Sequence, residues 1–243
     1  MSNPSNAKSK RKRKSATSKS SNNMWSSSSK KKRGSSTTSS SGLNTDNAEK
    51  LFQEIADEDD DQVAGMEGIS QLCEKLDIDP LEDLRVLVLL WKMGANEKPA
   101  QISKQEWMQG CAKLNVDSIA KFQNILPSLD TGFLDQTEFK DFYKFCFQFN
   151  RQGTHRTLDK ELVVALIKMV LKERIPKDRL DSFCDFVESQ ESYTRITLDQ
   201  WTSFLDFCYE CEDLSSYDES TSAWPVLIDE YVEFMEERAK NKK

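Results

Sequence analysis

Three aspartates at every second position, Asp57, Asp59 and Asp61, are the first side chains of this sequence that could bind a ligand. Carboxylates at alternate positions open the ligand loop of a calcium-binding helix-loop-helix. The rest of that motif is missing, because Gln62 stands where the sharp turn requires glycine and Gly68 where a bidentate glutamate closes the shell. The pattern favours a solvated acidic loop within a helix-loop-helix that binds no metal.

A second kind of chemistry would use thiol and imidazole groups. Cys208 and Cys211 have the spacing of half a zinc site, but no second pair follows, and His155 is the only histidine. A Ser or Cys nucleophile needs a base within hydrogen-bond reach, which a single histidine scarcely supplies. We expect no metal, no cofactor, and a buried helical stripe at the two cysteines. Catalysis by paired carboxylates stays open, since the chain holds 41 Asp and Glu.

Charge divides the chain into two parts. Residues 1–45 contain eleven Lys and Arg, sixteen serines and no acid; subtracting those cations from the totals of 34 basic and 41 acidic residues leaves a net charge of −18 over residues 46–243. A segment so poor in apolar side chains cannot offset its ordering entropy. We therefore predict a disordered basic tail over 1–45 and a folded acidic domain over 46–238.

The cations of the tail form two clusters, which are Lys10, Arg11, Lys12, Arg13 and Lys14, then Lys30, Lys31, Lys32 and Arg33. They predict a nuclear-import signal and a nuclear protein with a smaller cytoplasmic fraction. A weak nucleic-acid tail is the less favoured alternative, because no aromatic side chains are interleaved with the charge, and a merely solubilising tail is a third. The acidic body should repel nucleic acid, so no nucleic-acid partner is expected.

Helix signals dominate the body of the chain. Capping boxes at Ser103-x-x-Glu106, Asp135-x-x-Glu138 and Thr197-x-x-Gln200 predict helices over 104–114, 136–149 and 198–211. Asp79 followed by Pro80 predicts another helix that runs to Met93. Apolar spacing of three and four residues adds helices at 47–56, 66–76, 118–126, 158–173, 178–189 and 225–238. We expect an all-α fold of ten helices with no convincing strand. The longest apolar run, Val86 to Trp91, is too short to span a bilayer, so no membrane partner is expected.

Several motifs together resemble one known family. They are Leu205-Asp206-Phe207, the segment Leu214 to Glu219, and Ala223-Trp224-Pro225 with the run to Phe234; upstream lie Gly65 to Ile69, Leu89 to Lys92, Ser103 to Trp107 and Phe139 to Tyr143. This sequence resembles the defective-in-cullin-neddylation family over about residues 50–237, its potentiating-neddylation (PONY) domain. The resemblance implies a compact multi-helix domain with a metal-free EF-hand-like first part. Its members are not enzymes but scaffolds.

The resemblance implies three partners for a monomeric protein. These are the winged-helix region at the cullin C-terminus, the N-acetylated neddylation conjugating enzyme, and the RING subunit of the cullin ligase. A cullin-binding patch would consist of Asp199, Ala223 and Asp229. Without the resemblance, each Asp could simply complement its own helix terminus. The chain departs from the family at Ser220-Thr221-Ser222, which is one residue longer than the usual Glu-Gly.

The second implied site is a pocket for the acetylated N-terminal methionine of the conjugating enzyme. Its expected residues are Val86, Leu89, Leu90, Met93, Ile102, Phe149, Leu166 and Met169. A buried methionine side chain would contribute about 1.5–3 kcal/mol, and acetylation removes an ammonium that is costly to desolvate. The basic head, in place of a ubiquitin-associated domain or a myristoylated glycine, resembles the nuclear members. The alternatives are a calcium sensor, a calcium-independent EF-hand-like nuclear adaptor, and a chromatin- or RNA-associated protein.

Overall fold

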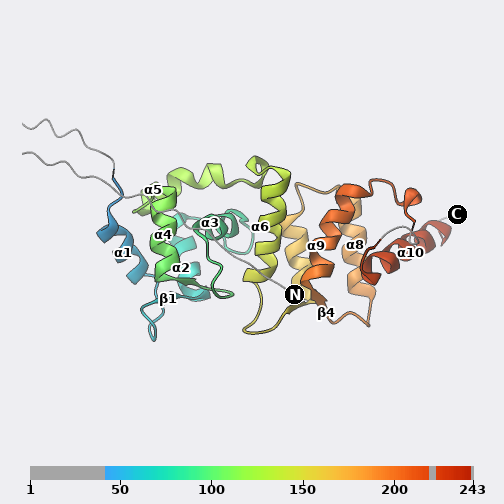
Figure 1. The fold of residues 1–243 in the computed structure, drawn as a ribbon, viewed down its shortest axis with the longest axis horizontal. Helices are drawn as coiled ribbons and strands as arrows, with labels where there is room; N and C mark the ends of the chain where they lie inside the picture. The colour runs from blue at the N-terminus through green and yellow to red at the C-terminus, as the bar shows by residue number, and fades with distance from the viewer. Residues whose placement is uncertain (1–41, 219–222, 242–243) are drawn as a thin grey trace, which may run out of the picture. The chain divides into compact units, whose positions relative to one another are not determined.

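The computed structural model of the 243-residue chain describes residues 42–218 and 223–241 (Figure 1). Residues 1–41 of the predicted tail, which include both basic clusters, lie outside the described residues. The helices are α1 Thr45–Gln53, α2 Met66–Leu76, α3 Arg85–Met93, α4 Lys104–Leu114, α5 Ile119–Ile125, α6 Gln136–Phe149, α7 Lys160–Val170, α8 Lys177–Ser189, α9 Leu198–Glu210 and α10 Val226–Asn241. The expectation of a mostly helical fold is confirmed. None of the helices described is long and apolar enough to cross a membrane.

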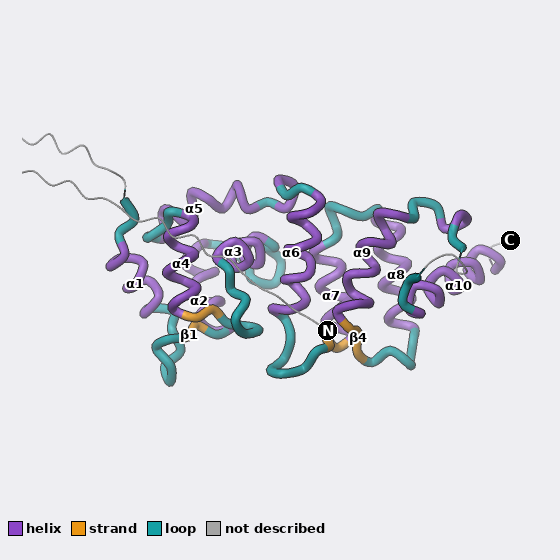
Figure 2. Tube along the Cα trace, in the orientation of Figure 1, coloured by secondary structure: helices purple, strands orange, loops and turns teal. Residues whose placement is uncertain are grey.

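The expectation of no strand is wrong. The strands are β1 Val63–Ala64, β2 Ile102–Ser103, β3 Thr157–Asp159 and β4 Arg195–Thr197. Ala64 pairs with Ile102, and Leu158 pairs with Ile196, both in antiparallel ladders (Figure 2). Strands of two or three residues are too short to show the alternation by which a sequence reveals a strand.

Each strand leads directly into a helix, and this order gives the fold a repeat. The first unit joins α1-β1-α2 to α3-β2-α4, and the second joins α6-β3-α7 to α8-β4-α9. A helix, a loop with a short paired strand and a second helix form the EF-hand arrangement. The EF-hand-like architecture expected for the first part therefore occurs twice.

The first loop has kept this arrangement while using its acids differently. Asp57 Oδ1 accepts a hydrogen bond from the Gly65 N–H at 2.8 Å, so the leading carboxylate closes the loop. At Gly68 an added Cβ would lie 1.8 Å from the Ile55 carbonyl oxygen. The position at which a calcium loop carries glutamate therefore accommodates no side chain. Over residues 42–218 and 223–241 no three acidic, Cys or His side chains cluster as a metal site would require.

The predicted helix start at Asp79 is wrong, and α3 begins at Arg85. The Asp79 carboxylate does accept a hydrogen bond from the Leu81 N–H at 2.8 Å, but it caps only a single turn. Asp83 offers a second start, because its Oδ1 accepts from the Arg85 N–H at 3.0 Å. The Arg85 guanidinium also binds the Asp83 carboxylate at 2.5 Å. This ion pair lowers the pKa of Asp83, and the two acids divide the expected helix into a turn and a helix.

Each EF-hand-like pair is built around one buried tryptophan. Trp107 occupies the fourth position of α4 and donates its indole N–H to the Ala48 carbonyl at 2.9 Å. Trp201 occupies the fourth position of α9 and donates to the Tyr143 carbonyl at 2.9 Å. Both are at most 1% exposed. A capping box followed by a tryptophan whose indole N–H donates to a backbone carbonyl therefore recurs at equivalent places in the two halves.

Helix α6 connects the two halves. It packs against α3 of the first pair and α9 of the second. Trp91 on α3 meets the Phe142 ring edge-on at 5.7 Å and donates its indole N–H to Asp141 at 2.9 Å. Tyr143, one residue further along, stacks on Trp201 at 4.2 Å. Aromatic contacts made by two consecutive residues of α6 therefore fix α3 and α9 relative to each other.

Calcium should leave the stability of this protein unchanged, because the leading carboxylate closes the loop and the closing ligand is absent. The melting temperature of the full chain, measured with millimolar calcium and with a chelator, tests this. Gly68→Glu restores the missing glutamate but should lower the melting temperature without conferring calcium dependence, since its Cβ meets the Ile55 carbonyl. Gln71→Glu, on the exposed face of the same helix, is the matched control. A calcium-dependent rise in melting temperature for the parent would contradict the expectation.

Candidate functional site

The position of Asp199 follows from how α9 begins. Thr197 and Gln200 form a reciprocal capping box, in which Gln200 N–H donates to Thr197 Oγ1 at 3.2 Å and Thr197 N–H donates to Gln200 Oε1 at 2.9 Å. Trp201 is directed into the core. Because residues two apart lie on nearly opposite faces of a helix, Asp199 is exposed. The helix dipole favours a carboxylate in this first turn.

Asp229 lies in the first turn of α10, where its neighbours are core residues. Leu227, Ile228 and Tyr231 are at most 1% exposed, which leaves Asp229 half-buried at the edge of the core. The Tyr217 hydroxyl donates a hydrogen bond to Asp229 Oδ1. Ala223 is exposed just before the helix.

The tertiary structure brings the starts of α9 and α10 together. Gln200 of α9 and Leu227 of α10 border the same closely packed apolar cluster, together with Phe183 of α8. Tyr193, in the loop before β4, lies on this side as well. Its burial and the Glu230 and Asp229 carboxylates raise the pKa of its hydroxyl to about 12. The predicted residues Asp199 and Asp229 therefore belong to adjacent first turns, although thirty positions separate them in the sequence.

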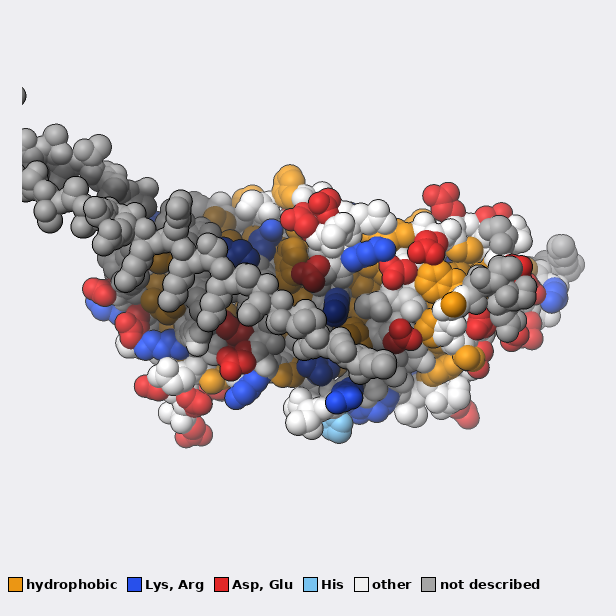
Figure 3. Space-filling view, viewed as in Figure 1, with side chains coloured by type: hydrophobic (Ala, Val, Ile, Leu, Met, Phe, Trp, Pro, Cys, Tyr) orange, Lys and Arg blue, Asp and Glu red, His pale blue; other side chains and the backbone are white. Residues whose placement is uncertain are grey.

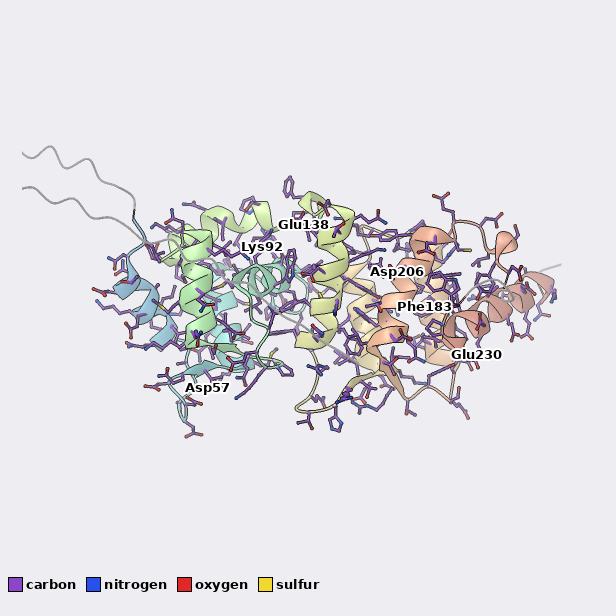
Figure 4. The ribbon with its side chains drawn as sticks, viewed as in Figure 1. Asp57, Lys92, Glu138, Phe183, Asp206 and Glu230 are labelled. Atoms are coloured by element: carbon purple, nitrogen blue, oxygen red, sulfur yellow. The ribbon has the colours of Figure 1, made fainter. Side chains whose placement is uncertain are left out.

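Negative charge on this surface is not compensated locally. Within the described part of the chain, Asp199, Asp229 and Glu230 form no ion pair with Lys or Arg. Glu230 Oε2 is buried and has no hydrogen-bond partner there. Figure 4 shows Glu230 at the start of α10, and Figure 3 shows acidic and apolar side chains together over α8, α9 and α10. Such a surface suits a partner with a basic side chain.

Sequence reasoning missed two members of this surface, Tyr193 and Glu230. Glu230 directly follows Asp229 and could have been found, because two consecutive acids in a first helical turn are a recognisable signal. No local signal indicates Tyr193. Its role depends on the fold, which places the β4 loop against α10.

The predicted acetyl-methionine pocket is largely closed in this structure. Seven of its eight residues are at most 4% exposed, namely Val86, Leu89, Leu90, Met93, Ile102, Phe149 and Leu166. Met169 is half-buried. These side chains come from α3, β2, α6 and α7, so they belong to both halves of the fold. Most of the predicted pocket is therefore continuous with the hydrophobic core.

Two cavities reach this set of residues from different sides. Phe149 lines a cavity of about 100 Å³ that also includes Ala95, Pro99 and Phe145. The Ala100 N–H donates to the Phe149 carbonyl at 2.8 Å and ties the loop after α3 to the end of α6.

Met169 lines a separate cavity of about 710 Å³. The other six predicted residues line neither of these two cavities. The lining of the 710 Å³ cavity includes six acids and three cations. The acids are Asp77, Asp79, Glu82, Asp83, Asp130 and Glu173, and the cations are Arg85, Lys172 and Arg174.

The two cysteines of the expected stripe are half-buried rather than fully buried. Cys208 lies on α9, and burial raises the pKa of its thiol to about 12, which keeps it protonated. Cys211 ends the helix, and its thiol donates to the Asp213 carbonyl at 3.3 Å. Both are free thiols. A protonated thiol is a poor metal ligand and a poor nucleophile.

Comparison with known proteins gives one consistent result. A family model described as Cullin binding matches residues 121–234, which contain α6 to α9 and most of α10. The chain is 37% identical to DCN1-like protein 4 of Danio rerio over 179 residues, or 73% of this chain and 62% of the relative. It is 35% identical to DCN1-like protein 5 of Homo sapiens, with 73% of each chain covered. With DCN1-like protein 3 of Xenopus tropicalis the identity is 37% over 79% of this chain and 63% of the relative.

The matched region contains Asp199, Ala223 and Asp229 together with the tryptophan that orients α9. The chain spans 62% of the length of DCN1-like protein 4 from Danio rerio and from Homo sapiens, which is less than two thirds. Its similarity to DCN1-like protein 5 covers nearly three quarters of that protein at 35% identity. This protein therefore belongs to the DCN1-like family, whose domain carries the Cullin binding description.

Proposed function

We propose that this protein is a non-catalytic scaffold of cullin neddylation, which binds a cullin and the N-acetylated conjugating enzyme at separate sites. The observation that carries the proposal is the agreement between the Cullin binding match at 121–234 and the uncompensated acids at the starts of α9 and α10. The expected result of scaffolding is orientation, because holding two reactants in place raises their effective concentration without any catalytic side chain.

The cullin side of the proposal rests on charge and shape. Asp199 and Asp229 lie in the first turns of α9 and α10, and Ala223 is a small exposed residue three positions before α10. Two carboxylates with a small residue between them leave room for a basic side chain of the cullin winged-helix region. Helix dipoles keep both carboxylates favourable in the free protein.

The conjugating-enzyme side rests on the junction between the halves. The cavity beside Phe149 and Pro99 measures about 100 Å³. Its lining also includes the polar or charged side chains of Asn96, Lys98, Gln148 and Arg151, so an acetylated methionine would place its side chain against Phe145, Phe149 and Pro99 after small movements of the loop. Because α6 connects this junction to α9, both partners would be held at a fixed distance. The RING subunit would then contact the assembled conjugating enzyme and cullin.

The basic clusters between Lys10 and Arg33 are proposed to direct the protein to the nucleus, with a smaller cytoplasmic fraction. A nuclear adaptor that binds a cullin without a conjugating enzyme is the second candidate. Binding of an acetylated peptide separates the two functions.

Charge reversal in the patch should abolish cullin binding. Asp199→Lys and Asp229→Lys exchange an attraction for a repulsion of several kcal/mol, and Ala223→Arg also fills the gap. Each variant should lose detectable affinity for a cullin C-terminal domain in calorimetry and lose stimulation of neddylation, with the melting temperature and acetyl-peptide binding retained. Asp178→Lys reverses an exposed acid in the first turn of α8 and is the matched control. A folded Asp229→Lys protein that binds like the parent would show that the patch is misplaced.

Acetylation should control binding of the conjugating enzyme. A peptide of its N-terminus should bind at least about tenfold more tightly when acetylated, since a free ammonium is costly to desolvate. Pro99→Ala, in the lining of the cavity beside Phe149, should weaken the acetylated peptide about tenfold by removing apolar contact. Leu162→Ala removes a half-buried side chain of α7 outside that cavity and should have little effect. Equal loss for both variants would place the peptide elsewhere.

Removing the basic tail should abolish nuclear accumulation and leave cullin affinity nearly unchanged. The deletion should end at residue 41, because Asn44 caps α1 and its N–H donates to Asp117 at 2.8 Å. Replacing only the two clusters with serine keeps the length and is the control. Microscopy of a fluorescent fusion and calorimetry give the two results, and a truncated protein still concentrated in the nucleus would contradict the import proposal.

A further inference from the structure

Asp199 and Asp229 are not held in the same way. The Asp199 carboxylate makes no hydrogen bond within residues 42–218 and 223–241. Asp229 accepts one from the hydroxyl of Tyr217 in a partly buried contact. The residue that restrains Asp229 lies twelve positions earlier, in the segment between α9 and α10.

That segment is anchored from outside the patch. Asp213 accepts hydrogen bonds from the Ser215 N–H at 2.9 Å and the Ser215 hydroxyl at 2.7 Å, which fixes the 3-10 helix Leu214–Ser216. Arg179 of α8 donates to the carbonyls of Cys211 and Glu212 at 3.0 and 2.9 Å. The backbone that leads to Tyr217 is therefore tied to α8.

The Tyr217 ring is fixed by aromatic contacts. It meets Phe207 of α9 edge-on at 5.7 Å, and the same phenylalanine meets Trp224 at 5.9 Å. Phe207 is fully buried. With its ring held on α9 and its backbone tied to α8, the phenol presents its hydroxyl to α10 at a fixed place.

We propose that Tyr217 is a positioning residue of the cullin-binding patch, which holds the Asp229 carboxylate in the orientation that receives a basic side chain. The proposal rests on the proposed function of that patch. With one oxygen restrained by the phenol, the second oxygen stays available to a partner. Tyr193 lies near the same carboxylate, which contributes to the raised pKa of the Tyr193 hydroxyl. A carboxylate already fixed in place loses less side-chain entropy when it binds.

Tyr217→Phe tests this, because it removes one hydroxyl and keeps the ring on Phe207. Affinity for a cullin winged-helix domain should fall about tenfold, the scale of a hydrogen bond to a charged group. The full-length protein should stay folded, with a melting temperature lowered by only a few degrees and an acetyl-peptide affinity close to that of the parent. Tyr209→Phe removes a hydroxyl from α9 outside the patch and is the matched control. Unchanged cullin affinity for Tyr217→Phe would overturn the proposal.

A double-mutant cycle separates positioning from a general structural effect. Asp229→Asn should weaken binding measurably, and adding Tyr217→Phe to it should cost less than about twofold more, since the tyrosine acts through that carboxylate. A full tenfold loss in both backgrounds would overturn the proposal. If Asp229→Asn alone binds like the parent, the patch itself is misassigned, and the proposed function fails together with the inference.

Discussion

The burial of two tryptophans is the constraint on which the fold and its surface depend. Trp107 and Trp201 each sit at the fourth position of a capped helix, and each gives its indole N–H to a backbone carbonyl of a neighbouring segment. A buried N–H without a partner would be costly, so this contact fixes both the depth and the rotation of the helix. Once Trp201 faces the core, Asp199 must face solvent. The orientation of the proposed patch is thus a consequence of packing on the opposite side of α9.

The same acidic residue type has two different roles in this protein. Asp57 is used internally, where it closes a loop of EF-hand shape by accepting from the Gly65 N–H. Gly68 lets α2 approach the Ile55 carbonyl too closely for any side chain. The first loop is therefore closed by a hydrogen bond and by close packing. Asp199 and Asp229, in contrast, form no ion pair among the residues that the structure describes, and in the proposed function their charge meets a partner.

Helix α6 places the two proposed sites at a fixed separation. Its end at Phe149 borders the small cavity and the loop after α3, while Tyr143 in its middle stacks on the tryptophan of α9. Close-packed aromatic contacts of α6 with α3 and α9 hold these helices at a fixed separation, because protein interiors deform little. The proposed scaffold would work by orientation and would therefore require such a rigid connection between its two sites.

Local signals in the sequence determined most of the helices, because a capping box or an apolar period is contained within a few residues. Ser103, Asp135 and Thr197 begin their helices as expected, and 104–114 and 136–149 have the expected bounds. Such signals compete where they repeat, so α3 begins at Arg85, next to Asp83, and not after Asp79. The family and the identity of Asp199, Ala223 and Asp229 came from the resemblance. Only the tertiary structure decided what depends on distant segments: the paired strands, the closure around Phe149 and Leu166, and the phenol of Tyr217 on Asp229. Those contacts join residues whose proximity is set by packing and not by neighbours in the chain, and no local pattern records them.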